Sequence, residues 1–227
     1  NSAGNILTGG AGNDSIWTFS EMSVGISSYN TLIGGAGDDT YYISSSTDTV
    51  TENSGEGTDT INSVVTYTLS SNVENLTLAS NYGSINGTGN SSANTITGNL
   101  GENTLTGGGG DDTLIGGAGD DTYYVDSTSD TVTENSGEGT DTVSSSATFT
   151  LSSNVENLTL TGSSAINGTG NSDANTITGN SAANTLTGGA GNDTLTGGAG
   201  DDTLTGGTGN DTYYVDSTSD TVTENSG

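Results

Sequence analysis

Apolar residues in this chain mostly stand singly between polar neighbours and recur at a spacing of nine. Segments such as Thr-Leu-Thr and Thr-Ile-Thr place one apolar side chain between two β-branched ones, which is typical of a short strand with one inward face. Gly, Asn and Asp separate these segments and favour turns. The pattern predicts many short strands joined by tight turns. The phased apolar positions are Ile96, Leu105, Leu114, Tyr123, Val132, Ile177, Leu186, Leu195, Leu204, Tyr213 and Val222.

The spacing reflects a nine-residue repeat of the form G-G-x-G-x-D-x-U-x, in which U is apolar. Glycine adopts positive φ without steric cost, so the first six positions suit a turn and the last three suit a strand. Two such units make a coil of 18 residues, and stacked coils form two parallel sheets at a strand spacing of about 4.8 Å. Seven copies begin at Gly9, Gly34, Gly107, Gly116, Gly188, Gly197 and Gly206.

The predicted fold class is therefore an all-β parallel β-roll or β-helix solenoid. We expect residues 1–227 to form one continuous calcium-binding solenoid. Because the chain begins and ends inside a repeat, we interpret it as a slice of a longer array. Residues 18–29 break the nine-residue phase and are expected to form an irregular insertion. The stretches that begin at Val64 and Ala147 alternate as strands do, and we expect wider coils there; a separate small β domain is the alternative.

A second irregularity lies between the full repeat units. The step from Asp48 to the next phased aspartate, Asp59, is eleven residues, and the step from Asp130 to Asp141 is the same. We interpret these steps as two-residue bulges at Glu52-Asn53 and at its counterpart, Glu134-Asn135.

Composition narrows the possible chemistry. The 227 residues include 28 Asp and Glu but no Lys, Arg, His, Cys or Pro, for a net charge of −28. The chain thus lacks disulfides, thiolate metal sites, histidine bases and the cationic clamps that nucleic-acid binding needs. It contains no apolar run long enough for a membrane span. We expect no catalytic residues, because the repeat singles out no unique pair of carboxylates.

The aspartates at position six decide how such an acidic chain can fold. In 18-residue coils, Asp193 lies beneath Asp211 and Asp202 beneath Asp220. Two carboxylates about 4.8 Å apart repel by roughly 3–4 kcal/mol at an effective dielectric near 20, and several such pairs would exceed the stability of a typical domain. A divalent cation between the coils reverses the sign. Calcium fits best because it takes six to eight oxygen ligands, whereas zinc and copper prefer nitrogen or sulfur.

Not every turn carries the same expectation. The alternative reading is a plain hydrogen-bonded turn without an ion, and it gains weight where the G-G-x-G signature is missing, as at Asp48, Asp130 and Asp220. Other coils carry asparagine at position six, and there we expect ion-free turns held by amide ladders. These asparagines are Asn94, Asn103, Asn175 and Asn184.

The seven nonapeptides resemble the RTX, or hemolysin-type, calcium-binding β-roll of secreted bacterial proteins. In that family, aspartates at position six of two stacked turns hold calcium, and backbone carbonyls of positions one to four complete the shell. The resemblance implies side-chain ligands at Asp14, Asp39, Asp112, Asp121, Asp193, Asp202 and Asp211, with Asp48, Asp130 and Asp220 as further candidates. It implies carbonyl ligands in the turns marked by Gly9, Gly34, Gly107, Gly109, Gly116, Gly188, Gly197 and Gly206.

The resemblance also implies a secreted or cell-surface location, with several bound Ca2+ ions folding the chain outside the cell. Our leading interpretation is a structural rod of a surface-layer, adhesin or filament-forming protein, with end-to-end self-association through uncapped coils. One alternative is the accessory module of a secreted protease, lipase or polysaccharide epimerase. Rows of outward threonines suggest a third reading, an ice-binding solenoid. Calcium ions are the expected partners, with no nucleic acid and no membrane span.

Overall fold

The computed structural model describes residues 4–18, 29–79 and 83–224. Within these ranges the chain forms 24 β-strands without a helix, so the predicted all-β solenoid is confirmed. A helix able to cross a membrane is accordingly not found in the described part of the chain. The chain divides into two compact units, Asn1–Gly116 and Gly117–Gly227, and each is described by itself. Residues 19–28 of the predicted insertion lie outside the described ranges.

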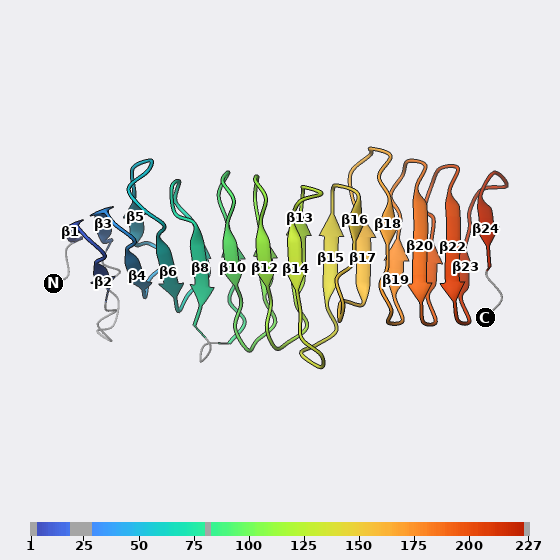
Figure 1. Cartoon of the computed structure of the whole chain (residues 1–227), viewed down its shortest axis with the longest axis horizontal. Helices are drawn as coiled ribbons and strands as arrows, with labels where there is room; N and C mark the ends of the chain where they lie inside the picture. Colours follow the sequence, from blue (N-terminus) through green and yellow to red (C-terminus); the bar gives the residue numbers. More distant parts are fainter. Residues whose placement is uncertain (1–3, 19–28, 80–82, 225–227) are drawn as a thin grey trace. The chain divides into compact units, whose positions relative to one another are not determined.

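The first unit contains strands β1 to β12, which alternate between two sides of a coil (Figure 1). The even-numbered strands pair in parallel in the order β2-β4-β6-β8-β10-β12, and the odd-numbered strands form two shorter ladders, β1-β3-β5 and β7-β9-β11. The strands are β1 (Ile6–Ala11), β2 (Ser15–Trp17), β3 (Thr31–Ala36), β4 (Thr40–Ile43), β5 (Thr49–Thr51), β6 (Thr60–Ser63), β7 (Tyr67–Thr68), β8 (Asn75–Leu78), β9 (Gly87–Thr88), β10 (Thr95–Thr97), β11 (Thr104–Thr106) and β12 (Thr113–Ile115).

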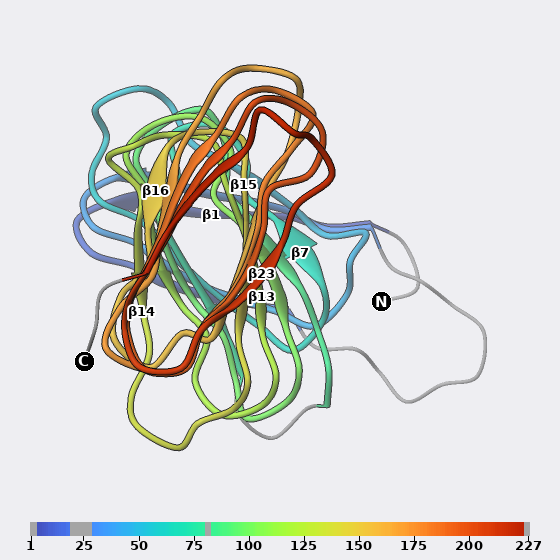
Figure 2. The same cartoon turned by 90° about the vertical axis from the view of Figure 1, so that its right-hand side faces the viewer.

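The second unit repeats this plan with strands β13 to β24. The ladder β13-β15-β17-β19-β21-β23 lines one side, and β16-β18-β20-β22-β24 lines the other, as the view along the coils shows for β13 and β16 (Figure 2). The strands are β13 (Thr122–Val125), β14 (Thr131–Thr133), β15 (Thr142–Ser145), β16 (Phe149–Thr150), β17 (Asn157–Leu160), β18 (Gly168–Thr169), β19 (Thr176–Thr178), β20 (Thr185–Ala190), β21 (Thr194–Thr196), β22 (Thr203–Thr208), β23 (Thr212–Tyr214) and β24 (Thr221–Thr223).

The apolar residue at position eight points into the coil, as the sequence pattern predicts. Ile96 pairs in register with Leu76 and Leu114, and none of the three side chains is exposed. The threonines on either side of Ile96, Thr95 and Thr97, are only half-buried and face outward. Each coil therefore adds one inward side chain per strand to a thin apolar core, and burial of this ladder supplies the hydrophobic stabilisation of the fold.

The length of the coils varies more than the repeat alone predicts. Two coils made of full units have the expected 18 residues, as in the register Thr176–Thr194–Thr212. The step from Thr40 to Thr60 takes 20 residues, because the turn is longer, and the next step to Asn75 takes only 15. The expectation of wider coils is therefore wrong for the 15-residue coil that includes β7 in the first unit, and for its counterpart in the second.

The alternative of a separate small β domain is excluded. Strand β8 pairs with β6 on one side and with β10 on the other, so the irregular stretch is part of the same ladder. Its tight turn has Asn72 with a φ of 62°, and Asn154 occupies the same place in the second unit with a φ of 65°. Asparagine tolerates this left-handed conformation better than most residues, so the predicted turns at Ser70-Asn72 and Ser152-Asn154 are confirmed.

The glycines at positions two and four shape the turns. In the turn that begins at Gly107, Gly108 has a φ of +92° and Gly110 a φ of +120°. A Cβ atom on Gly108 would collide with the carbonyl oxygen of Asn90 in the coil before, whereas one on Gly109 would meet nothing closer than the Cα atom of Ser91 at 3.9 Å. Glycine is therefore needed at position two for both conformation and close approach, and position three accepts a side chain.

A pair of substitutions in this turn tests that division. Gly108→Ala should lower the free energy of unfolding by about 1–3 kcal/mol, because alanine resists the positive φ and has no room for its methyl group. Gly109→Ala, one residue away, should leave stability nearly unchanged. Thermal unfolding of both variants in saturating calcium measures the difference. Equal losses in the two variants would contradict the turn geometry.

Candidate metal centres

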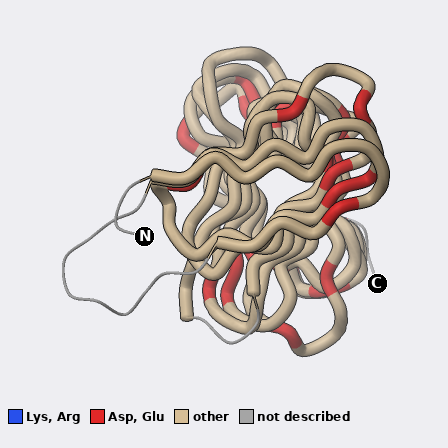
Figure 3. The backbone as a smooth tube through the Cα atoms, turned by 90° about the vertical axis from the view of Figure 1, so that its left-hand side faces the viewer, with Lys and Arg blue, Asp and Glu red and all other residues tan. Residues whose placement is uncertain are grey.

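Acidic residues gather at the bends of the coils, and no basic side chain accompanies them (Figure 3). The position-six aspartates occupy the inner edge of these bends. Asp39, Asp193 and Asp202 are each only 1% exposed. Burial raises the pKa of Asp193, with the charge of Asp211 adding to the rise and the Asn175 amide opposing it. These carboxyl groups therefore lie where ionisation is costly unless positive charge is supplied.

Each of these aspartates uses its two oxygens differently. The Oδ1 atom accepts a hydrogen bond from the backbone amide one coil before: the Asp14 amide donates to Asp39 at 2.7 Å, and the Asp193 amide to Asp211 at 2.8 Å. The Oδ2 atom is buried and has no hydrogen-bond partner. This holds for Asp14, Asp39, Asp48, Asp193, Asp202 and Asp211.

The position-one glycine forms a cradle around this orphaned oxygen. A Cβ atom on Gly9 would lie 2.5 Å from the Oδ2 atom of Asp14, and one on Gly197 would lie 2.5 Å from the Oδ2 atom of Asp202. Gly34, Gly107, Gly188 and Gly206 make the same approach to the aspartates of their own turns. The conformation of the turn thus brings backbone and carboxylate oxygen together, and a larger residue would fill the space between them.

The structure stacks several predicted ligands on each other. Asp14, Asp39 and Asp59 form a hydrogen-bonded column in the first unit, and Asp202 lies beneath Asp220 in the second. The stacking of Asp193 under Asp211 and of Asp202 under Asp220 is confirmed. Asp48 instead receives its hydrogen bond from Asn30 in the coil before, at 3.1 Å.

Two of the degenerate candidates differ from the full repeats. The Oδ2 atom of Asp220 accepts hydrogen bonds from the amides of Asp216 and Ser217 in its own turn, at 3.2 and 3.0 Å. Asp130 accepts the equivalent pair of bonds from Asp126 and Ser127, both at 3.0 Å. In these turns backbone amides already satisfy the oxygen that points inward in a full repeat.

The position-five residues face solvent, as the interchange of Asp and Asn there predicts. Asp38, Asp111, Asp120 and Asp201 are all exposed. Asp38 accepts a hydrogen bond from the amide of Thr58 at 2.9 Å, and Asp120 accepts one from Thr140 at the same distance. Position five therefore links neighbouring coils from the outside and leaves the inner edge to position six.

The asparagine turns are satisfied without an ion, but in a different way from the amide ladders expected. The side-chain amide of Asn94 donates to the backbone carbonyls of Val73 and Glu74, at 3.0 and 3.3 Å, and its oxygen accepts from the amide of Asn90. Asn90 donates to the carbonyls of Ser70 and Val73. The amides thus bond to backbone carbonyls. The same pairing recurs at Asn99–Asn103, Asn171–Asn175 and Asn180–Asn184.

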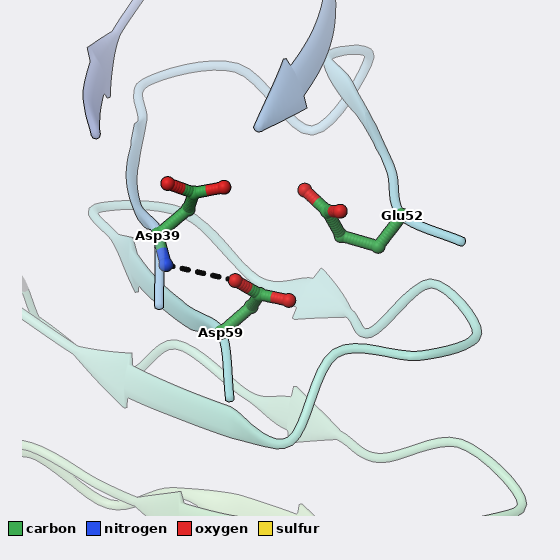
Figure 4. A group of neighbouring side chains, drawn as sticks. All are labelled: Asp39, Glu52 and Asp59. Carbon is green, nitrogen blue, oxygen red and sulfur yellow. Dashed lines mark hydrogen bonds between the residues drawn. The ribbon is translucent and has the colours of Figure 1, made fainter. Parts of the chain in front are cut away.

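Two clusters contain a glutamate that the sequence analysis assigned to a bulge. Carboxylate oxygens of Asp39, Glu52 and Asp59 lie within 4.8 Å of one another in the first unit. Asp121, Glu134 and Asp141 form the same cluster in the second, and all six residues are buried. Glu52 approaches the two aspartates from another segment of the chain (Figure 4). The bulge itself is confirmed as a longer turn, but Glu52 and Glu134 point inward and are not part of it.

The glutamates resist ionisation in the metal-free state. Burial raises the pKa of Glu52 to about 7, with the charges of Asp59 and Asp39 adding to the rise and the hydrogen bond from the Gly34 amide opposing it. Burial likewise raises the pKa of Glu134 to about 8, together with the charges of Asp141 and Asp121. Burial also raises the pKa of Asp141 to about 6.

Comparison with known proteins decides the family. The sequence profile of the RTX calcium-binding nonapeptide repeat, in four copies, matches residues 1–20, 27–50, 88–131, 169–204 and 188–222. These segments include all seven full repeat units and more than half of the chain. The chain belongs to the RTX calcium-binding nonapeptide repeat family.

RTX repeats bind calcium and are typical of secreted or surface proteins. Partial relatives of this chain are the endo-1,3-1,4-beta-glycanases ExsH and EglC of Rhizobium meliloti (strain 1021), which are 48% and 42% identical over 67 residues. The aligned stretch covers 30% of this chain and only 13% of either glycanase.

The residues present fit the calcium that the family implies. Calcium requires several oxygen ligands, and each full RTX turn offers an orphaned Oδ2 atom beside a glycine-lined bend that only a residue without a side chain could form. The cation would supply the positive charge that the sequence withholds. Asp14, Asp39, Asp193, Asp202 and Asp211 are the side chains that would hold it in the turns described above, with backbone carbonyls of the turns.

Two adjacent aspartates provide a matched test of this assignment. Asp202→Asn should weaken calcium binding at its own edge of the coil by at least about tenfold, because it removes the charge of an inward oxygen. Asp201→Asn removes the same charge from the solvent-facing position five and should leave affinity nearly unchanged. Calorimetric titration of both variants with calcium measures the effect. Equal weakening would show that only net charge matters.

Proposed function

We propose that the chain is a calcium-folded structural module of an extracellular protein, and that its own residues have no catalytic role. The row of buried aspartate oxygens without a hydrogen-bond partner carries this proposal. No cationic side chain exists anywhere in the sequence to neutralise them. A solenoid of this composition is stable only when cations occupy its bends, so calcium acts as a structural component.

Calcium-dependent folding follows from where the ions would bind. The native coils bring two or more carboxylates together, whereas the unfolded chain keeps them apart, so calcium binds the native state preferentially and stabilises it by mass action. Low calcium inside a cell would leave the RTX chain unfolded for export, and millimolar calcium outside would fold it. The wide separation of the two calcium levels makes the transition directional.

A rod within a surface-layer, adhesin or filament-forming protein is the role that this architecture supports best. The coils repeat one plan without inserting a lobe between strands, and the alternating outward threonines give each coil a regular face. Repeated coils transmit their order only to neighbours, which suits an extended spacer. Electron microscopy of the calcium-loaded protein tests for filaments formed by end-to-end association.

The accessory-module alternative rests on the partial match to the two glycanases. In this reading the RTX module accompanies a carbohydrate-active domain of a longer secreted protein and folds with it outside the cell. Assay of the intact parent protein and of the isolated chain on a mixed-linkage β-glucan separates the two roles. Activity in the parent alone supports the accessory role, and inactivity of both supports the structural rod.

Removal of calcium provides the direct test of the proposed function. In excess chelator, the circular dichroism spectrum should show an unfolded chain. The β signal should return on addition of millimolar calcium but not of equal magnesium, which requires a smaller octahedral site and dehydrates reluctantly. Sodium chloride at matched ionic strength controls for screening of the charges. An unchanged β spectrum in chelator would contradict the proposal.

A further inference from the structure

The buried glutamates occupy a place where the repeat otherwise has glycine. In the ladder of β3 and β5, Ile33 pairs with Thr51, so the next residues in register are Gly34 and Glu52. Gly34 is the first residue of a full unit and leaves space at the bend. The amide of Gly34 donates to the Oε1 atom of Glu52 at 2.9 Å, and the glutamate side chain, 6% exposed, fills that space.

A buried tyrosine marks the same space independently of the carboxylates. Tyr41 is fully buried, and its hydroxyl group has no hydrogen-bond partner. A Cβ atom on Gly34 would collide with both this hydroxyl oxygen and the Oδ2 atom of Asp39, so the two oxygens lie against the same bend. The Oε2 atom of Glu52 is also buried without a partner. Three orphaned oxygens of different residues therefore meet where water and hydrogen-bond donors are excluded.

The arrangement recurs with the sequence. Tyr123 stands in the second unit where Tyr41 stands in the first, and its hydroxyl donates to the Oε1 atom of Glu134. The Oε2 atom of Glu134 is buried without a partner, and its side chain is 7% exposed. In all three repeats with tyrosine at position eight, a glutamate follows eleven residues later. The pairs are Tyr41–Glu52, Tyr123–Glu134 and Tyr213–Glu224.

Repeats with leucine at position eight lack this glutamate. The residues eleven places after Leu114, Leu195 and Leu204 are Val125, Gly206 and Val215. Tyrosine and glutamate thus occur together in this chain. An unpaired buried tyrosine hydroxyl and an unpaired buried carboxylate are each costly, and their joint recurrence indicates a shared ligand rather than two separate packing choices.

We propose that Glu52 and Glu134 each complete a deep calcium site of three carboxylates, with Asp39 and Asp59 in the first unit and with Asp121 and Asp141 in the second. The inference rests on the proposed calcium binding and adds to it two sites with a third carboxylate from across the coil. Neither glutamate belongs to a nonapeptide unit. Three carboxylates present more negative charge than a pair of stacked aspartates, so these sites should fill first as calcium rises.

The test uses the whole chain and a matched control. Glu52→Gln with Glu134→Gln removes the two inward charges while keeping side-chain shape. Glu56→Gln with Glu138→Gln removes the same charge four residues away, where both glutamates are exposed and bond only within their own turn through Asn53 and Asn135. Equilibrium dialysis against calcium counts bound ions and affinities for wild type and both variants.

Wild type should bind its two tightest calcium ions at least about tenfold more strongly than the rest. The Glu52/Glu134 variant should lose this tight pair and keep the weaker ions, and the Glu56/Glu138 variant should retain both classes. Single substitution of Glu52 or Glu134 should remove one tight ion each. Retention of the tight pair in the double variant would overturn the inference while leaving the proposed function intact. Absence of calcium binding in wild type would overturn both.

Terbium gives a second readout that does not depend on any variant folding. This ion replaces calcium and emits when a nearby tyrosine is excited, and Tyr41 and Tyr123 lie beside the proposed sites. The first two equivalents of terbium added to wild type should therefore carry most of the tyrosine-sensitised emission. Emission that grows evenly over all bound ions would contradict the placement of the tight sites.

Discussion

The structure depends on one electrostatic constraint, which is that buried carboxylates meet at every full repeat turn without a cationic side chain to balance them. Column stacking of Asp14, Asp39 and Asp59 satisfies one oxygen per residue through backbone amides and leaves the other facing inward. A thin core of one apolar side chain per strand cannot offset several such repulsions. The fold is therefore conditional on bound cations in a way that an ordinary hydrophobic domain is not.

The asparagine turns show the same problem solved with covalent groups. In these turns the side-chain amides of Asn90 and Asn94 donate to the carbonyls of the coil before, so the positive end of a dipole stands where a cation would otherwise be needed. The chain thus alternates between coils that complete themselves and coils that require an ion. This division allows a metal-independent segment to hold the register of its neighbours. It explains why glycine at position two gives way to asparagine together with the change at position six.

Much of the fold could be predicted from the sequence because its information is local and repeated. Inward position-eight residues, outward position-five residues and stacked position-six aspartates all follow from a period of nine applied to a strand and a turn. The length of the coil that contains Tyr67 could not be predicted, because there the turn chemistry departs from the repeat and pairing across coils sets the register. The inward course of Glu52 was missed because the two extra residues of that turn were assigned to the glutamate itself, whereas they follow it. Recurrence of tyrosine eleven residues before each such glutamate was the available signal.

The central claim is that cations occupy the bends between stacked aspartates. Crystals grown in calcium, with diffraction recorded at a wavelength where calcium scatters anomalously, test it most directly. The account predicts anomalous peaks at the bends within 2.3–2.6 Å of the inward oxygens of Asp39, Asp193, Asp202 and Asp211, the distance typical of calcium and oxygen. Bends that contain only water, in a chain that keeps the same coils, would contradict it.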